Sequence, residues 1–300
     1  MKLCVNLWLT VLLSTHLLGA TTPHDLAFWQ SIKAHDFAVP AGESVDRLAL
    51  EIVDLAGDAN PALRDDCGYE ILANWVYRKD LLSADQLEAV RRKLIRGMTF
   101  HIGESDNPTI FRRSFSALYI SILAAQDLRK PFLSEAAFRE TLDTTLNCYA
   151  AEKDLRGYVP ENGWAHATAH AADLVKFLSR NAKLTTADQR RVVEGIAQRC
   201  RTVPSVFVWG EDARIAAALS SSIERKDFDP TIFDAWFQTL AEDNKQLWKA
   251  PTLDPAAYVR VRTQANVLAQ LAARLAAKQP NEVPASFLAA LTKLVAELNG

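Results

Sequence analysis

Apolar side chains recur along most of this 300-residue chain at every third or fourth position, the spacing of one face of an α-helix. Alternation of apolar and polar positions, which would indicate strands, is almost absent. Ser83-x-x-Gln86 and Thr185-x-x-Asp188 have the spacing of capping sequences, and Pro61 stands at a first helical position. The pattern predicts about twelve helices. Those with two predicted ends cover residues 23–37, 45–55, 61–76, 83–98, 134–149, 210–224, 254–277 and 284–298. The others are predicted by their starts alone, at residues 108, 164, 185 and 229.

The links between these helices are short, so consecutive helices are expected to pack as antiparallel pairs. Stacked pairs build a curved superhelix, open like a HEAT array or closed into a toroid. No strict repeat period is present, which argues against a regular consensus solenoid. The sequence therefore predicts an all-α fold, an irregular α/α superhelix, and its hydrophobic fraction of 49% is ample for one large domain.

Residues 1–20 have the composition of an export signal. Lys2 gives a short positive start, residues 3–18 are mostly apolar, and Gly19 and Ala20 offer small side chains for cleavage. The apolar run is too short for a comfortable transmembrane helix, so no stable membrane span is expected after cleavage. The alternative is a buried N-terminal helix. The pattern predicts a periplasmic or secreted protein whose single helical domain covers residues 21–300.

Three cysteines, Cys67, Cys148 and Cys200, follow the predicted signal. Because three is an odd number, at most one internal disulfide can form and one thiol must remain. All three lie beside apolar residues within helical patterns, where cysteine behaves as a small hydrophobe. We expect structural cysteines without a metal or catalytic role, and their disulfide state stays open.

The charge of the chain bears on its partners. Its formal net charge is −2, and no run of basic residues opposes that balance locally. Neither nucleic acid nor an anionic membrane would be attracted to such a surface. The partners that remain are a small molecule or another protein.

Candidate chemistry is concentrated in residues 152–173, EKDLRGYVPENGWAHATAHAAD. Pro160 and Gly163 break any helix that arrives from before, and an alanine-rich helix is expected from Trp164 onward. On that helix His166 and His170 stand at i and i+4, so both side chains project from the same face. A pair of histidines on one face indicates a candidate site.

Four segments carry a resemblance to a known family: LRDDCGYEIL from residue 63, IGESDNPTIFRRSFSALYI from residue 102, EKDLRGYVPENGWAHATAHAADL from residue 152 and WGEDAR from residue 209. Together they resemble the bacterial family known as domain of unknown function 2785. The resemblance covers about residues 60 to 215 and is most specific in the third segment. No activity is established for that family, so the resemblance marks positions in the chain without implying a reaction.

The two histidines are separated by about 6 Å along a helix, close enough to bind one divalent metal ion such as zinc. A third ligand would come from Glu152, Asp154, Glu211 or Asp212, and Asp173 would accept the remaining ring N–H of His170. This spacing is not the H-E-x-x-H signature of zinc proteases. The alternative is a pair of histidines at the border of an apolar face, satisfied by neighbouring carboxylates.

Aromatic and basic residues extend the candidate site. Trp164 and Trp209 each stand beside a glycine at a predicted helix start, where a ring can stack on a sugar or simply join the core. One of the arginines Arg112 and Arg113 is expected to face inward and to need a carboxylate partner. Arg214 can pair with a carboxylate or hold an anionic ligand.

We predict that these segments converge on one concave pocket, because starts of alternate helices fall on the same rim of a superhelix. Three classes of function fit such a pocket: a hydrolase, metal-assisted or carbohydrate-directed, a binding protein for a small polar or anionic ligand, or a scaffold whose groove holds a peptide or protein. The residues expected around the pocket are Glu152, Asp154, Arg156, Trp164, His166, His170, Glu211 and Arg214. Catalytic roles are assigned to Glu152, Asp154, His166, His170 and Glu211, and ligand-binding roles to Arg156, Trp164, Trp209, Arg214 and Arg113.

Overall fold

The computed structural model describes residues 24–279 and 283–299, so the predicted signal lies outside the described residues. Within this part the helices are α1 (Leu26–Ala34), α2 (Val45–Leu55), α3 (Glu70–Ala73), α4 (Ala84–Met98), α5 (Thr109–Arg129), α6 (Glu135–Ala151), α7 (Ala167–Ser179), α8 (Thr186–Thr202), α9 (Glu211–Ile223), α10 (Asp234–Lys249), α11 (Pro255–Ala276) and α12 (Ala285–Asn299). Two π-helical segments, η1 (Ala62–Tyr69) and η2 (Asn74–Arg78), a 3₁₀ turn η3 (Pro230–Phe233) and two short strands, β1 (Tyr158–Val159) and β2 (Gly163–Trp164), complete the described elements.

The predicted all-α class is confirmed, because most of the described residues are helical and β1 and β2 form a single small antiparallel pair. Both predicted capping sequences begin helices. Ser83 accepts from the backbone N–H of Gln86, and Thr185 accepts from that of Asp188. In each pair the second side chain bonds back to the capping backbone, which satisfies two otherwise free donors at the helix start.

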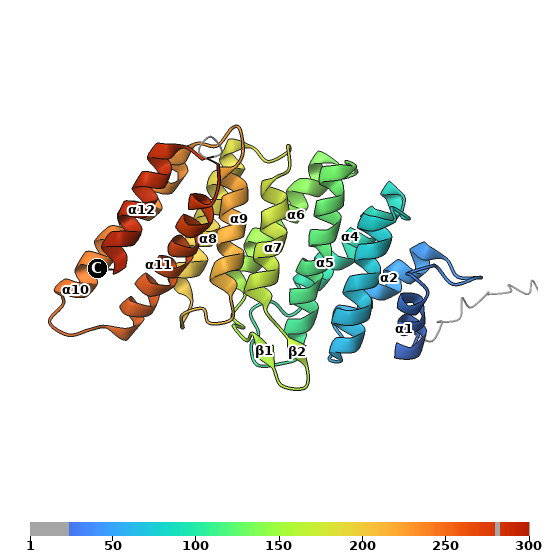
Figure 1. Ribbon diagram of the computed structural model, residues 1–300. Helices are drawn as coiled ribbons and strands as arrows, with labels where there is room; N and C mark the ends of the chain where they lie inside the picture. Colours follow the sequence, from blue (N-terminus) through green and yellow to red (C-terminus); the bar gives the residue numbers. More distant parts are fainter. Residues whose placement is uncertain (1–23, 280–282, 300) are drawn as a thin grey trace, which may run out of the picture.

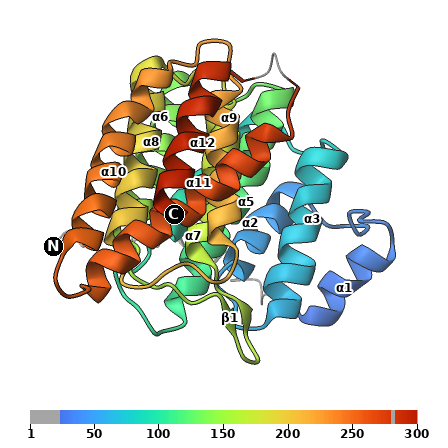
Figure 2. The same cartoon turned by 60° about the vertical axis from the view of Figure 1, so that its left-hand side comes forward.

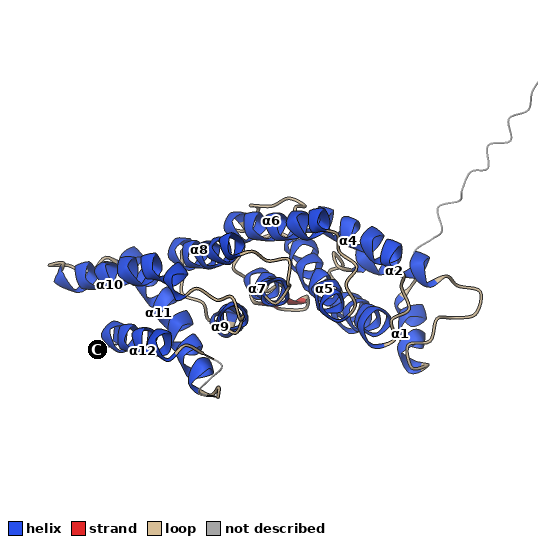
Figure 3. Ribbon diagram, turned by 90° about the horizontal axis from the view of Figure 1, so that it is seen from above, coloured by secondary structure: helices blue, strands red, loops and turns tan. Residues whose placement is uncertain are grey.

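The helices form two rows that curve together (Figure 3). Helices α2, α4, α6, α8 and α10 form an outer row that arches over an inner row containing α5, α7 and α9. In the inner row α5 packs on α7, α7 on α9 and α9 on α11. The chain progresses from one end of the stack to the other without returning (Figure 1), so the irregular superhelix is open, a choice between open and closed forms that the sequence did not decide.

One continuous hydrophobic core runs between the two rows from α1 to α12. Fully buried rings occur along its whole length: Trp29, Trp75, Tyr119, Phe138 and Phe233. Burial of such rings contributes most of the stabilisation of a domain of this kind. No helix in the described part of the chain has both the length and the apolar character needed to cross a membrane.

The segment predicted as one helix over residues 61–76 is interrupted by π-helical turns on both sides of the short α3. The wider turn of a π-helix moves side chains away from α-helical spacing. Arg64 is fully buried and lies over the rings of Phe111 and Phe115, at 4.1 and 4.5 Å from their centroids. Tyr119 donates its hydroxyl to the Arg64 carbonyl at 2.7 Å, which fixes η1 on α5.

Helix α7 begins at Ala167, which corrects the start predicted at Trp164. The reason is the strand pair: Tyr158 lies opposite Trp164, and the N–H of His166 donates to the Arg156 carbonyl at 3.0 Å. His166 therefore stands just before the helix, with φ of 55° in the left-handed region. The hairpin lies at one edge of the stack, beside the start of α7 (Figure 2).

Candidate functional site

A pocket of about 550 Å³ lies on the inner row of helices, where η1, α5 and the starts of α7 and α9 meet. Its volume is in the range that small-molecule ligands occupy in proteins. The inner row lies on the concave side of the superhelix (Figure 3), and its helices α5, α7 and α9 contribute residues to the pocket lining. The pocket is lined by Asp65, Tyr69, Phe115, Leu118, Trp164, His166, His170, Trp209, Gly210, Ala213 and Arg214.

Two tryptophans form an aromatic wall of this pocket. Trp164 is 40% exposed and Trp209 is 43% exposed, so neither ring belongs to the core. Their ring centroids lie 6.0 Å apart with the planes nearly perpendicular, and Tyr158 extends the group from Trp164 at 5.5 Å. Large aromatic rings that remain half exposed beside a pocket are available to a ligand.

His166 is held in one orientation by Trp164 and Trp209. Its ring stacks on the Trp164 indole at 4.9 Å, and its Nε2 lies 2.9 Å from the Trp209 carbonyl. A carbonyl oxygen can only accept, so Nε2 carries the proton and Nδ1 keeps its lone pair. Burial lowers the pKa of His166, an effect that the carboxylate of Glu211 partly opposes. The ring is therefore neutral at pH 7.

His170 is held from α5. Its Nδ1 lies 2.8 Å from Ser114 Oγ, and the Ser114 hydroxyl is also in contact with the Ala165 carbonyl. The single hydroxyl hydrogen must point at the carbonyl, which has no hydrogen of its own, so Nδ1–H of His170 donates to Ser114. Nε2 is left unprotonated on a side chain that lines the pocket. Burial holds the pKa of His170 well below its usual value.

Asp173 does not accept from His170 as the sequence predicted. It forms ion pairs with Arg214 and, at 3.2 Å, with Lys176. Asp173 pairs with Arg214 on α9, whereas His170 bonds to Ser114 on α5, although positions three apart lie on the same face of a helix. Ser114, which lies 56 positions before His170, takes the predicted role.

The charges around the pocket are paired. Asp65 accepts from the Arg64 guanidinium at 2.7 Å, and Arg214 pairs with Asp173. Burial raises the pKa of the Asp65 carboxyl, and the neighbouring Arg64 opposes that shift. Among the residues that line the pocket, Asp65 and Arg214 carry opposite charges, and each is paired with a partner outside the lining.

Glu211 supports the wall instead of lining the pocket. It is buried in the first turn of α9, and its carboxylate accepts from the backbone N–H of Trp209 at 2.8 Å. A carboxylate in the first turn that bonds back to the preceding backbone fixes the entry of the chain into the helix. Glu211 therefore positions Trp209 and, through the Trp209 carbonyl, His166.

Glu152, Asp154 and Arg156, like Glu211, do not line the pocket, so the structure brings four of the eight predicted residues to it. Glu152 is buried and accepts from the Nε and Nη2 atoms of Arg113 at 2.6 and 3.1 Å. Asp154 is also buried and pairs with Arg156 at 2.6 Å. The Arg113–Glu152 pair fastens the loop before β1 to α5, whereas the Asp154–Arg156 pair lies within that loop. The expected inward arginine with a carboxylate partner is Arg113.

A metal ion has no complete set of ligands at this site. In residues 24–279 and 283–299, no group of three or more His, Cys, Asp and Glu side chains converges in a way that could hold a metal. His166 and His170 lie close together, with ring centroids 5.7 Å apart, yet the predicted third ligands are engaged elsewhere: Glu152 by Arg113 and Glu211 by the Trp209 backbone. The predicted zinc site lacks its third protein ligand.

The three described cysteines are free thiols. Burial raises the pKa of the Cys148 thiol to about 11 and that of Cys200 to about 12. Burial also raises the pKa of Cys67. Thiols with raised pKa values are weak nucleophiles at neutral pH, so these residues pack as small apolar side chains.

Sequence reasoning did not assign Asp65, Tyr69, Ser114 or Phe115 to the site. All four lie within the segments that carry the family resemblance, from residues 63 and 102, which is the signal that points to them. Their convergence with His170 depends on α5 packing beside α7 and on η1 being held against α5 by the Tyr119–Arg64 hydrogen bond, contacts between distant parts of the chain.

The fold is that of an α/α superhelical protein, with a pocket of about 550 Å³ among η1, α5 and the starts of α7 and α9. A family model matches residues 98–273, more than half of the chain, and the chain belongs to that family, described as protein of unknown function (DUF2785). Asp65 and Tyr69 precede the matched segment, whereas the other pocket residues fall within it. No curated protein and no solved structure matches the chain.

Proposed function

We propose that the concave pocket binds a small, neutral, hydroxyl-rich ring ligand, the chemistry that a saccharide unit presents. The observation that carries this proposal is the wall of Trp164 and Trp209, half exposed at the pocket and meeting nearly at right angles. An indole face packs against the C–H face of a sugar ring, which removes apolar surface from water while the hydroxyl groups remain free to hydrogen-bond.

The polar groups of the pocket match such hydroxyl groups. His166 Nδ1 and His170 Nε2 are acceptors, because the other ring nitrogen of each histidine donates to the protein. Asp65 adds carboxylate oxygens, and the half-exposed Arg214 adds N–H donors. A ligand that both donates and accepts through several hydroxyl groups can satisfy this set.

The charge balance favours a neutral ligand over an anionic one. Arg214 already has Asp173 as its partner, and an anion would have to compete with that carboxylate. The neutral histidines supply no positive charge at pH 7. A neutral ring therefore fits the pocket better than a phosphate or a carboxylate does.

A hydrolytic step is the second candidate, supported by the state of His170. His170 is buried and lines the pocket, its Nε2 is unprotonated, and its Nδ1–H is fixed by Ser114, which is the arrangement of a general base. In that role Nε2 would take one proton from a water molecule as the water oxygen bonds to the anomeric carbon, the glycosidic C–O bond would break, and His170 would pass the proton on to the departing oxygen. His170→Gln would then abolish turnover while leaving ligand affinity within a few-fold of wild type.

The binding proposal is tested by screening mono- and oligosaccharides by thermal shift and measuring affinities by titration calorimetry. Trp209→Ala should weaken binding by at least about tenfold, the equivalent of 1.4 kcal/mol. The matched control is Trp248→Ala, since Trp248 on α10 is 61% exposed and lies outside the pocket. If no saccharide binds and peptides do, the scaffold alternative replaces this proposal.

A further inference from the structure

Tyr158 stands beside the aromatic wall but outside the pocket. Its side chain is 50% exposed and does not belong to the pocket lining. In the hairpin, Tyr158 lies directly opposite Trp164. Residues that pair directly across two antiparallel strands project from the same face, so both rings stand on one face of the hairpin. Their ring centroids lie 5.5 Å apart, with the planes at 74°.

Tyr158, Trp164 and Trp209 form a continuous series of rings that leads out of the pocket. The Trp164 centroid lies 5.5 Å from that of Tyr158 and 6.0 Å from that of Trp209. All three side chains are 40–50% exposed. An edge-to-face contact covers less of each ring than face-to-face stacking does. Ring surface beside the pocket therefore remains available to a part of the ligand that extends beyond it.

The pocket is larger than one sugar ring needs. Its volume of about 550 Å³ lies in the range that holds a drug-sized ligand, which is larger than a monosaccharide. Trp164 belongs both to the pocket lining and to the contact with Tyr158. A chain of sugar units that leaves the pocket past Trp164 therefore meets Tyr158 next.

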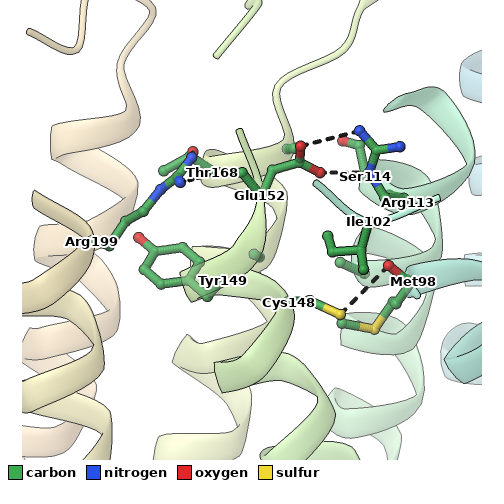
Figure 4. A pocket seen from close by; sticks show the side chains of 12 residues that line it. Met98, Ile102, Arg113, Ser114, Cys148, Tyr149, Glu152, Thr168 and Arg199 are labelled. Atoms are coloured by element: carbon green, nitrogen blue, oxygen red, sulfur yellow. Dashed lines mark hydrogen bonds and ion pairs between the residues drawn. The ribbon is translucent and has the colours of Figure 1, made fainter. Parts of the chain in front are cut away.

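The hairpin holds Tyr158 in a fixed position. At its turn, the Asn162 carbonyl accepts from the guanidinium of Arg64 at 2.6 Å. Before the hairpin, the Glu152 carboxylate is held by Arg113 of α5 at 2.6 Å (Figure 4). A surface that is already fixed loses little conformational freedom when a ligand binds, which favours affinity.

We propose that the ligand is an oligosaccharide of at least two units, and that Tyr158 packs against the unit next to the one held at Trp164 and Trp209. This inference rests on the proposed function, because Tyr158 has this role only if the pocket binds a saccharide. The phenol ring covers the apolar C–H face of the second unit, and its hydroxyl group can donate to or accept from the hydroxyl groups of that unit. Tyr158 thereby determines a preference for chains over single sugars.

The test measures affinity against chain length by titration calorimetry. Glucose, xylose and N-acetylglucosamine are each compared with their cello-, xylo- and chito-oligosaccharides of two to four units. In the series that binds, the disaccharide should bind the wild type about tenfold more tightly than the monosaccharide does. Tyr158→Ala should remove this gain and leave the affinity for the monosaccharide unchanged. Tyr158→Phe, which keeps the ring, should retain most of the gain.

The matched control is Tyr77→Ala, because Tyr77 on η2 is 41% exposed and lies outside the pocket. It should bind every chain length as the wild type does. Wild-type affinities that are equal for the monosaccharide and its oligomers would overturn the inference and leave the binding proposal intact.

Two further results with Tyr158→Ala would also overturn the inference. An equal loss of affinity for monosaccharide and disaccharide would mean that Tyr158 only positions Trp164. A gain with chain length that the variant retains would place the second unit elsewhere. If no member of any series binds, the proposed function itself fails, and this inference fails with it.

Discussion

At the scale of single residues, the hydrogen-bond acceptors of the pocket depend on which ring nitrogen carries the proton in each of its two histidines. His166 and His170 were identified from their spacing, but neither tautomer could be predicted from it. The tautomers follow from the Trp209 carbonyl and the Ser114 hydroxyl, which other elements bring into contact. Sequence spacing can locate a titratable pair, while its partners depend on tertiary packing.

The buried histidines predict how stability depends on pH. Because burial lowers their pKa values in the folded protein, the unfolded chain takes up protons first as the pH falls below about 6.5. The free energy of unfolding should therefore be constant near pH 7.5 and decrease below pH 6.5, by up to about 1.4 kcal/mol per pH unit for each histidine. Urea titrations at several pH values measure this slope.

His170→Gln should reduce that slope, and His101→Gln, at a half-exposed loop position, should not. Ligand affinity should fall over the same pH range, because protonation removes the acceptors of the pocket. A wild-type stability that is the same at pH 7.5 and pH 5 would contradict the neutral, buried state of these rings.

At the scale of elements, the β1–β2 hairpin fixes the position of the aromatic wall, because Trp164 belongs to β2. The capping boxes of α4 and α8 could be predicted because their residues are local, whereas the hairpin and the π-helical turns of η1 could not. Arg64 on η1 donates to the Asn162 carbonyl in the hairpin, at 2.6 Å. A contact across 98 positions has no signal in a local pattern.

Gly157 permits the hairpin to pack against Trp209. A Cβ atom at position 157 would overlap the Trp209 indole. Gly157→Ala should therefore displace that ring, lower stability by about 1–3 kcal/mol and weaken ligand binding. Chemical denaturation and tryptophan fluorescence report the two effects.

The matched control is Gly195→Ala on α8, where the new Cβ would meet Leu146 at an ordinary 3.5 Å. That variant should be neutral or more stable by about 0.5–1 kcal/mol, because alanine favours a helix interior. If Gly157→Ala behaves like this control, the close packing of the hairpin on Trp209 is wrong.

Arg64 links η1 to the hairpin and to its own preceding loop. It donates to Asp65, to the Asp58 carbonyl at 2.7 Å and to the Asn162 carbonyl. Lysine cannot supply this planar set of donors, so Arg64→Lys should cost about 2–4 kcal/mol in unfolding experiments. Arg92→Lys, at a side chain that is 66% exposed, should change stability by less than about 0.5 kcal/mol; equal effects would refute the linking role.

At the scale of the whole molecule, the superhelix brings residues of η1, α5, α7 and α9 together around one pocket. Helical periodicity and short links were sufficient to predict the class of fold. They also predicted that Trp164, His166, His170 and Arg214 lie around one pocket, since these residues stand at or near helix starts. The loop that holds Glu152 turns toward α5 instead, and no local pattern marks that direction.

Export is a prediction about the whole chain that rests on residues 1–20. If the signal is cleaved after Ala20, protein from the native host should have the intact mass of residues 21–300 and should be found outside the cytoplasm. A full-length cytoplasmic species of 33.3 kDa would count against it.

The most direct measurement of the central claim is a crystal structure of the protein with the tightest-binding saccharide from the screen. The account predicts a sugar ring in contact with the Trp164 and Trp209 indoles, with a hydroxyl group donating to His170 Nε2. Difference density in the cavity between α9 and α11, or at any site away from the two tryptophans, would contradict it.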